Sequence, residues 1–185
     1  MRKLENRELD RMSVEEFKIA SRIPVIIVLD NIRSLNNIGS VFRTADAFRA
    51  EAIYLCGITA RPPHRDINKT ALGATEPVDW RYFKETKDAI IELKDNSYKI
   101  IVIEQADESI MLDEFAHDTN EKIALVFGHE VVGVQETILE MADTCIEIPQ
   151  FGTKHSVNVS VSAGIVLWEF LCSYKNYLYL NNNNV

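Results

Sequence analysis

The chain has 185 residues, of which 46% are hydrophobic and 26% are charged, as is ordinary for one globular domain with its own core. Its net charge of −8 argues against a general nucleic-acid binder, and no apolar run reaches the roughly 18 residues that a membrane span needs. The first ten residues lack the apolar core of a signal peptide, so we expect a cytoplasmic protein with no membrane partner.

The charges are unevenly distributed along the chain. Residues 1–69 carry 12 Lys and Arg against 9 Asp and Glu, whereas residues 70–185 carry 8 against 19. An RNA partner would therefore contact mainly the N-terminal third. Ordinary scatter of charge on a solvated surface explains the same numbers, and composition does not separate the two interpretations.

Strand-like and helical patterns alternate along the chain. Residues 1–22 predict one or two short amphipathic helices, with Ser13 and Glu16 spaced as a capping box. The expected elements that follow are a strand over 24–30, a helix over 38–48, a strand over 52–56, an irregular stretch over 57–79, a helix over 82–94, a strand over 98–104, a short helix over 110–116, a strand over 123–127, a helix over 134–142 and a strand over 144–148. This alternation predicts an α/β fold with a mostly parallel sheet and helices on both faces.

The closing helix, expected over 158–174, is apolar almost all round. Such a helix packs on the core with one side and on another subunit with the other, or it is deeply buried. Its large residues Trp168, Phe170, Leu171 and Tyr174 predict a subunit contact. We expect three parts in the chain: a helical extension over 1–22, one domain over 23–178 and a disordered tail over 179–185.

The cysteines and histidines do not predict a metal site. Cys56, Cys145 and Cys172 are odd in number, widely spaced and set in apolar segments, which favours buried free thiols over disulfides or metal ligands. The four histidines show no paired spacing. We therefore expect no metal.

Three segments place small, polar and charged residues directly after strand-like runs. Their sequences are NNIGSVFRTADAF over 36–48, FGHEVVG over 127–133 and IPQFGTKHSVNVSV over 148–161. Ligands of parallel α/β sheets bind outside the carboxyl ends of the strands, so the three segments are expected to form one site. The Gly128–Gly133 spacing lacks the Gly-Lys-Ser/Thr of a phosphate loop, and the first strand lacks Gly-x-Gly-x-x-Gly. A neutral or mildly cationic adenosine-type ligand remains.

In order and spacing, the three segments resemble motifs one, two and three of the SpoU (TrmH) family of RNA ribose 2′-O-methyltransferases, in the SPOUT superfamily. The resemblance implies S-adenosylmethionine as methyl donor, a homodimer, and a C-terminal trefoil knot. It also implies an RNA substrate, with tRNA favoured over rRNA, and a non-catalytic RNA-binding dimer is the alternative of another class. The family's cofactor contacts correspond to Gly128, Ile148, Gly152 and Val157.

The family's functional polar positions correspond to Asn37, Arg43, Glu130, Ser156 and Asn158. We expect Arg43 to orient an RNA phosphate and the 2′-hydroxyl, because guanidinium groups stay protonated in proteins. Glu130 is either a base or a structural anchor, and Asn158 either serves the site or caps the last helix.

Other positions carry weaker expectations. His155 is better explained as a loop residue than as a base. Phosphate contacts are expected from Arg61, Arg65 and Lys69, with a solvated loop as the alternative. Arg49 stands where the family commonly has Gly, which questions the turn after the first motif.

Overall fold

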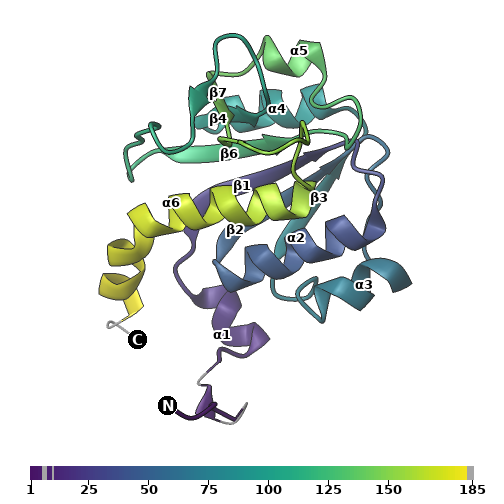
Figure 1. Ribbon diagram of the computed structural model, residues 1–185. Helices are drawn as coiled ribbons and strands as arrows, with labels where there is room; N and C mark the ends of the chain where they lie inside the picture. The colour runs from purple at the N-terminus through teal and green to yellow at the C-terminus, as the bar shows by residue number, and fades with distance from the viewer. Residues whose placement is uncertain (6–7, 10, 183–185) are drawn as a thin grey trace.

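The structure, a computed structural model, describes residues 1–5, 8–9 and 11–182, with side chains up to residue 175. Its centre is a seven-stranded sheet of strand order β3-β2-β1-β6-β4-β7-β5, in which every strand pair is parallel (Figure 1). The expected α/β class is confirmed. In the described part of the chain, no helix is long and apolar enough to cross a membrane.

The strands are β1 Ile23–Asp30, β2 Ala50–Cys56, β3 Asp79–Phe83, β4 Tyr98–Ile103, β5 Ile110–Met111, β6 Lys122–Phe127 and β7 Thr144–Glu147. The helices are α1 Val14–Ile19, α2 Leu35–Ala47, α3 Arg65–Ala71, α4 Thr86–Asp95, α5 Glu136–Leu139 and α6 Val159–Asn182. The tail predicted over 179–185 falls partly on residues 183–185, which lie outside the described residues.

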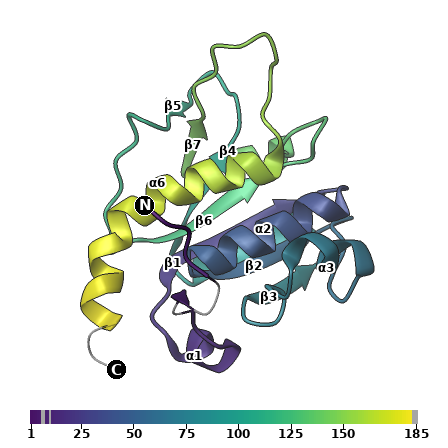
Figure 2. The same ribbon diagram turned by 60° about the horizontal axis from the view of Figure 1, so that its bottom comes forward.

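Helices cover both faces of the sheet because the central strands are apolar on both sides. Alternate β1 residues, such as Ile27 and Leu29, pack in one core with α2, α3 and α6. Their neighbours Ile26 and Val28 pack in a second core with α4 and α5. Figures 1 and 2 show α2 and α6 side by side across the first face.

The strand order brings the three motif segments to one edge. The chain runs outward from β1 to β2 and β3, then crosses to β4, and β6 later fills the place between β1 and β4. Such a reversal opens a crevice at the carboxyl ends of the strands. The first motif follows β1, the second follows β6, and the third follows β7.

Caps fix the ends of the first two helices. The predicted capping box of α1 is present: Ser13 Oγ accepts from the Glu16 N–H at 3.2 Å, and Glu16 accepts from the Ser13 N–H at 2.7 Å. The first motif's helix begins at Leu35, three residues before the prediction, because Ser34 caps it. Arg49 adopts φ 51°, so the turn is kept although glycine is absent.

Three sequence-based assignments are wrong. Residues 65–71, expected to be irregular, form α3, because His64 caps the helix and Ile67 and Ala71 are buried beneath it. Residues 79–83 form edge strand β3, and the helix expected from 82 begins at Thr86. The helix expected over 110–116 is replaced by strand β5 at its start, which pairs with β7. These segments are short or largely exposed, so their hydrophobic period is weak.

The prediction for the outer face of α6 also needs correction. Phe170 and Tyr174 are 1% and 0% exposed and belong to the first core, so they cannot contact another subunit. The outward apolar residues are Val161, Ile165 and Trp168, spaced by four and three residues. That spacing places them on one side of the helix.

The three cysteines are free, as predicted, but they are not equally buried. Cys56 is buried, Cys145 is partly buried and Cys172 is exposed. Burial, together with the nearby Asp30 carboxylate, raises the pKa of the Cys56 thiol to about 12, so this thiol is inert. Asp30 itself is fully buried and accepts hydrogen bonds from Thr86 Oγ1 at 2.5 Å and Gln135 Nε2 at 2.8 Å. It thereby ties the end of β1 to the starts of α4 and α5.

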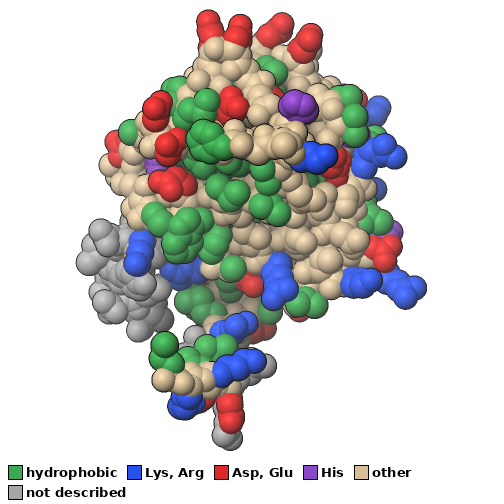
Figure 3. Space-filling view, viewed as in Figure 1, with side chains coloured by type: hydrophobic (Ala, Val, Ile, Leu, Met, Phe, Trp, Pro, Cys, Tyr) green, Lys and Arg blue, Asp and Glu red, His purple; other side chains and the backbone are tan. Residues whose placement is uncertain are grey.

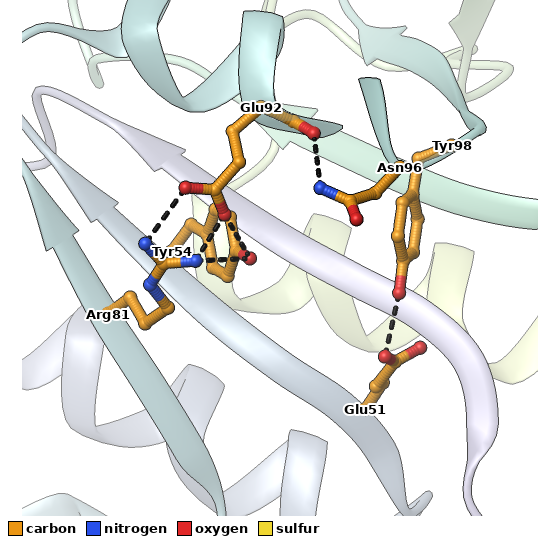
Figure 4. A network of polar contacts seen from close by, with 6 residues as sticks. All are labelled: Glu51, Tyr54, Arg81, Glu92, Asn96 and Tyr98. Carbon is orange, nitrogen blue, oxygen red and sulfur yellow. Dashed lines mark hydrogen bonds and ion pairs between the residues drawn. The ribbon is translucent and has the colours of Figure 1, made fainter. Parts of the chain in front are cut away.

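A polar network braces α4 against the sheet beside a cavity of about 440 Å³ (Figure 4). Glu92 on α4 forms an ion pair with Arg81 on β3 and accepts from Tyr54 Oη on β2 at 3.1 Å. Tyr98 Oη donates to Glu51 at 2.6 Å. These groups satisfy one another within the chain, which indicates a structural role.

Gly39 of the first motif is required by close packing of two helices. A Cβ at this position would lie 2.2 Å from Ile67 O and 2.2 Å from Thr70 Oγ1 of the helix α3 segment. The Thr70 hydroxyl also donates to Asn36 O at 3.0 Å. The glycine therefore lets α3 lie directly on α2.

We expect Gly39→Ala to destabilise the fold by about 1–3 kcal/mol, because the overpacking cost exceeds the helix propensity that alanine adds. Ser40→Ala, on the next residue of α2, is the matched control and should be neutral or slightly stabilising. Urea unfolding of both variants measures the difference. Equal stabilities would mean that α3 moves away at no cost.

Candidate active site

A cavity of about 420 Å³ lies at the carboxyl ends of β4, β6 and β7. Its lining comes from three segments far apart in sequence: residues 103–105, residues 127–133, and residues 147–162. The second and third segments carry the second and third motifs. The volume falls within the range of small-molecule sites, and the position agrees with the rule for parallel α/β sheets.

Glu130 of the second motif anchors the loop that precedes α2. Its Oε2 accepts from the Arg33 N–H at 3.2 Å, and its Oε1 accepts from the Ser34 N–H at 3.1 Å and from Asn37 Nδ2 at 3.3 Å. Burial alone would raise its pKa, but hydrogen bonds from its own backbone N–H, from these two backbone N–H groups and from Asn37 outweigh burial, so the pKa is lowered. These contacts favour the anchor over the base.

Asn37 links the second motif to the third. Its side chain donates to Glu130 Oε1 at 3.3 Å and its Oδ1 accepts from Asn158 Nδ2 at 3.2 Å. Asn158 Oδ1 in turn accepts from the Ser160 N–H at 2.9 Å and the Ser160 hydroxyl at 2.7 Å. Asn158 therefore caps α6 and holds the first motif at once. The predicted cap is thus present, and the role of Asn158 in the site stays a prediction.

The second motif forms a tight turn. The His129 and Gly133 backbones exchange hydrogen bonds of 3.0 and 2.9 Å, and His129 Nδ1 accepts from the Val131 N–H at 3.0 Å. A Cβ on Gly128 would lie 2.2 Å from Val134 N, so only glycine fits there without a shift. The same glycine lines the cavity.

Six of the nine residues predicted for catalysis or cofactor binding line the cavity. They are Gly128, Glu130, Ile148, Ser156, Val157 and Asn158. Asn37 is not in the lining but touches it through Glu130 and Asn158. His155 also lines the cavity.

Besides Asn37, two more predicted residues, Gly152 and Arg43, lie outside the lining. Gly152 is exposed, and a Cβ there would meet nothing within 4 Å. Gly152 therefore packs against no neighbour in the chain, and its contact with the cofactor stays a prediction. Arg43 is exposed on α2. Six residues along a helix place it about 9 Å beyond Asn37 along the axis.

Sequence reasoning missed the two carboxylates at the back of the site, Glu104 and Glu147. Glu104 accepts from the Val134 N–H at 3.1 Å and the Gln105 N–H at 2.9 Å, and Glu147 accepts from Ser109 Oγ at 3.1 Å. The only signal in the sequence was their place at the ends of strands. With Glu130, three carboxylates line the cavity, and none of the described residues lining it is Lys or Arg.

The sequence that carries the three motifs matches a known protein family. The model of the SpoU rRNA Methylase family matches residues 24–168, which include all three motifs. The chain belongs to this family. The resemblance inferred from the motifs is thus confirmed. Among the described residues of this SpoU protein, no group of three or more His, Cys, Asp or Glu could hold a metal ion.

Relatives of this SpoU chain include RNA methyltransferases of both major substrate classes. The 23S rRNA (guanosine-2′-O-)-methyltransferase RlmB of Neisseria meningitidis is 34% identical over 149 residues, which cover 80% of this chain and 58% of that protein. The chain thus spans less than two thirds of this relative's length. The crystal structure of the Aquifex aeolicus TrmH/SpoU tRNA modifying enzyme aligns with TM-score 0.80 and 25% identity, covering 91% of this chain and 84% of that one.

A third comparison shows the same fold. The AdoMet-bound rRNA methyltransferase of Sinorhizobium meliloti aligns with TM-score 0.76 at 23% identity and covers 83% of this chain and 61% of that one.

The two roles of Asn158 can be separated. Asn158→Ser keeps a capping oxygen but loses the amide donated to Asn37, whereas Asn158→Ala loses both. We expect the Ala variant to lose about 1 kcal/mol of unfolding free energy and the Ser variant to lose only a few tenths. Methyl transfer to RNA should fall in both. A fully active Ser variant would reduce Asn158 to a cap.

Proposed function

We propose that this protein is an S-adenosylmethionine-dependent RNA ribose 2′-O-methyltransferase. The observation that carries the proposal is the joining of all three family motifs by Glu130, Asn37 and Asn158 at the mouth of one cavity. A chain that had kept only the fold would not need to keep these three polar side chains in contact. tRNA is the first candidate substrate and rRNA the second, since the relatives named above divide between the two.

The lining of the cavity suits S-adenosylmethionine. Its acidic members, Glu104, Glu130 and Glu147, favour a ligand that carries positive charge and disfavour a phosphate-bearing cofactor. Gly128, Ile148 and Val157, which line the cavity, are the residues that would hold the cofactor. S-adenosylmethionine, when bound, would supply an electrophilic methyl group on a sulfonium.

The chain's own residues contribute mainly by position. Asn37, Glu130 and Asn158 fix the three loops relative to one another, which orients whatever the loops bind. Arg43 is exposed and makes no hydrogen bond or ion pair with the described residues, so its guanidinium is available to an RNA phosphate. The 2′-hydroxyl proton leaves to phosphate or water, since a guanidinium group is a poor base and Glu130 already accepts hydrogen bonds from two backbone N–H groups.

The RNA surface is proposed at α3 and the loop before it. Arg61, Arg65 and Lys69 are all exposed there, and the Arg61 guanidinium stacks 4.4 Å from the Tyr82 ring centroid. On the face seen in Figure 3, Lys and Arg side chains are more frequent in the lower half and along the right edge, and Asp and Glu side chains at the top and upper left. On this face the two signs of charge are thus partly separated.

We further propose a homodimer, a domain over 23–178 and a trefoil knot. The exposed row of Val161, Ile165 and Trp168 on α6 supplies an apolar contact surface, which the solution mass tests. The 1–22 extension packs on the domain through Phe17, which is 4% exposed. The knot is implied by the resemblance of the motifs to the family, and α6, which follows the third motif, packs on the face of the sheet opposite to α4 and α5.

Arg43 tests the mechanism. Arg43→Ala should keep its melting temperature and cofactor affinity, because the side chain is exposed and lies outside the cavity, yet lose methyl transfer by about a hundredfold or more. Arg43→Lys should recover little, since an ammonium lacks the planar fork of donors. Single-turnover transfer to tRNA and to rRNA, each from cells lacking the protein, is the measurement. Near-wild-type transfer by Arg43→Ala would move attention to Glu130.

Arg61, Arg65 and Lys69 test the RNA surface. Neutralising the three together should weaken RNA binding and flatten the dependence of log K on log salt by about 2 to 3 units, with cofactor affinity unchanged. The matched control neutralises Lys84, Lys87 and Lys94, which are exposed on or beside α4. An equal change of slope in the two variants would place the RNA elsewhere.

A further inference from the structure

The most exposed large apolar side chain of the described residues after Met1 is Phe151, at 98%. It lies in the third motif, between Gln150 and Gly152, on the long arc that joins β7 to α6 (Figure 2). Its ring makes no contact with another described aromatic ring or cation. Both ring faces are therefore open.

Phe151 is next in sequence to residues that line the cavity. Gln150 on one side of Phe151 and His155 on the other both line the cavity, whereas Phe151 and Gly152 stand clear of it. The opposite loop presents Val131 and Val132 with 81% and 76% exposure, and Val131 also lines the cavity. The turn made by His129 holds these two valines outward. The mouth thus has an apolar rim.

The charges at the mouth are segregated. Inside, Glu104, Glu130 and Glu147 repel phosphate. On the arc, Lys154 is exposed three residues after Phe151 and can meet a phosphate. An RNA strand would therefore keep its backbone at the rim while a nucleoside approaches the mouth.

Ribose methylation needs a hydroxyl held in place but no particular base. An open aromatic ring fulfils this need, because every base has a face on which it can stack. We propose that Phe151 stacks on a nucleobase of the substrate RNA at the mouth of the cavity, with Lys154 on the adjoining phosphate, and so positions the ribose. This inference rests on the proposed function.

The test compares an aromatic with an aliphatic side chain at position 151. Phe151→Leu keeps an apolar side chain without a ring, and Phe151→Trp keeps a ring. For methyl transfer to tRNA or rRNA from cells lacking the protein, we expect the Leu variant to raise KM about tenfold, in line with base–aromatic stacking. The Trp variant should stay within about twofold of the wild type. S-adenosylmethionine affinity and melting temperature should not change. Ile19→Ala, at an 81% exposed position in α1, is the control for loss of apolar surface.

Fluorescence gives a second, direct readout. The emission of Phe151→Trp, above the background of Trp80 and Trp168, should be quenched when the same RNA is added. Ile91→Trp, at a 43% exposed position on α4, away from the proposed RNA surface, should not be quenched. Quenching of both to the same degree would contradict stacking at Phe151.

Failure of the proposed function and failure of the stacking proposal give different results. A wild-type protein that neither binds S-adenosylmethionine nor methylates RNA overturns the proposed function. An active wild type with unchanged KM in Phe151→Leu overturns only the stacking. A Phe151→Leu variant that falls from dimer to monomer would show that a second copy covers the ring, which also overturns it.

Discussion

The contact of one carboxylate with two amides holds the working edge of this protein together. Glu130 accepts a hydrogen bond from the Ser34 N–H just before α2, and Asn37 Oδ1 accepts one from Asn158 Nδ2. Asn158 Oδ1 accepts from the Ser160 N–H and so caps α6. Each of the three side chains follows a different strand, so no local preference could bring them together. Glu130 and Asn158 are exposed, so each hydrogen bond is weak by itself, but together the contacts connect the three loops. The lowered pKa of Glu130 expresses the same arrangement, since its charge is held by donors.

Two glycines let backbone approach backbone where this edge is built. Gly39 admits α3 onto α2, and Gly128 admits Gly133 and Val134 behind the second motif. The Glu104 carboxylate accepts a hydrogen bond from the Val134 N–H, just after this turn. By contrast, a Cβ on Gly152 would meet no neighbour. The loop of the third motif borders the cavity at Gln150 and His155 and is open between them. A site that is to enclose a small cofactor and admit a large RNA needs both features: tight packing around the second motif and an open loop in the third.

Charge would separate the two ligands of the proposed function. The cavity is acidic within, while exposed cations lie on α3 and the loop before it, and Lys154 stands on the arc. A protein of net charge −8 can thus offer RNA a local surface of the right sign. Arg43 differs from both groups, because it is neither in the cavity nor in the α3 cluster. Arg43 is exposed on α2, and the proposed RNA phosphate is the partner that would give it a role.

The sequence by itself determined the strands of the sheet centre, the parallel α/β class and the motif residues that meet, because long apolar runs and the order of motifs are local properties of the chain. The short or exposed elements α3, β3 and β5 were missed, since they bury little and leave no clear period. Only the tertiary structure decided that Glu130 anchors a loop, that Asn158 contacts Asn37, that Phe170 and Tyr174 face inward, and that Glu104 and Glu147 enter the site. Those facts depend on contacts between residues up to 121 positions apart, which no window of sequence contains.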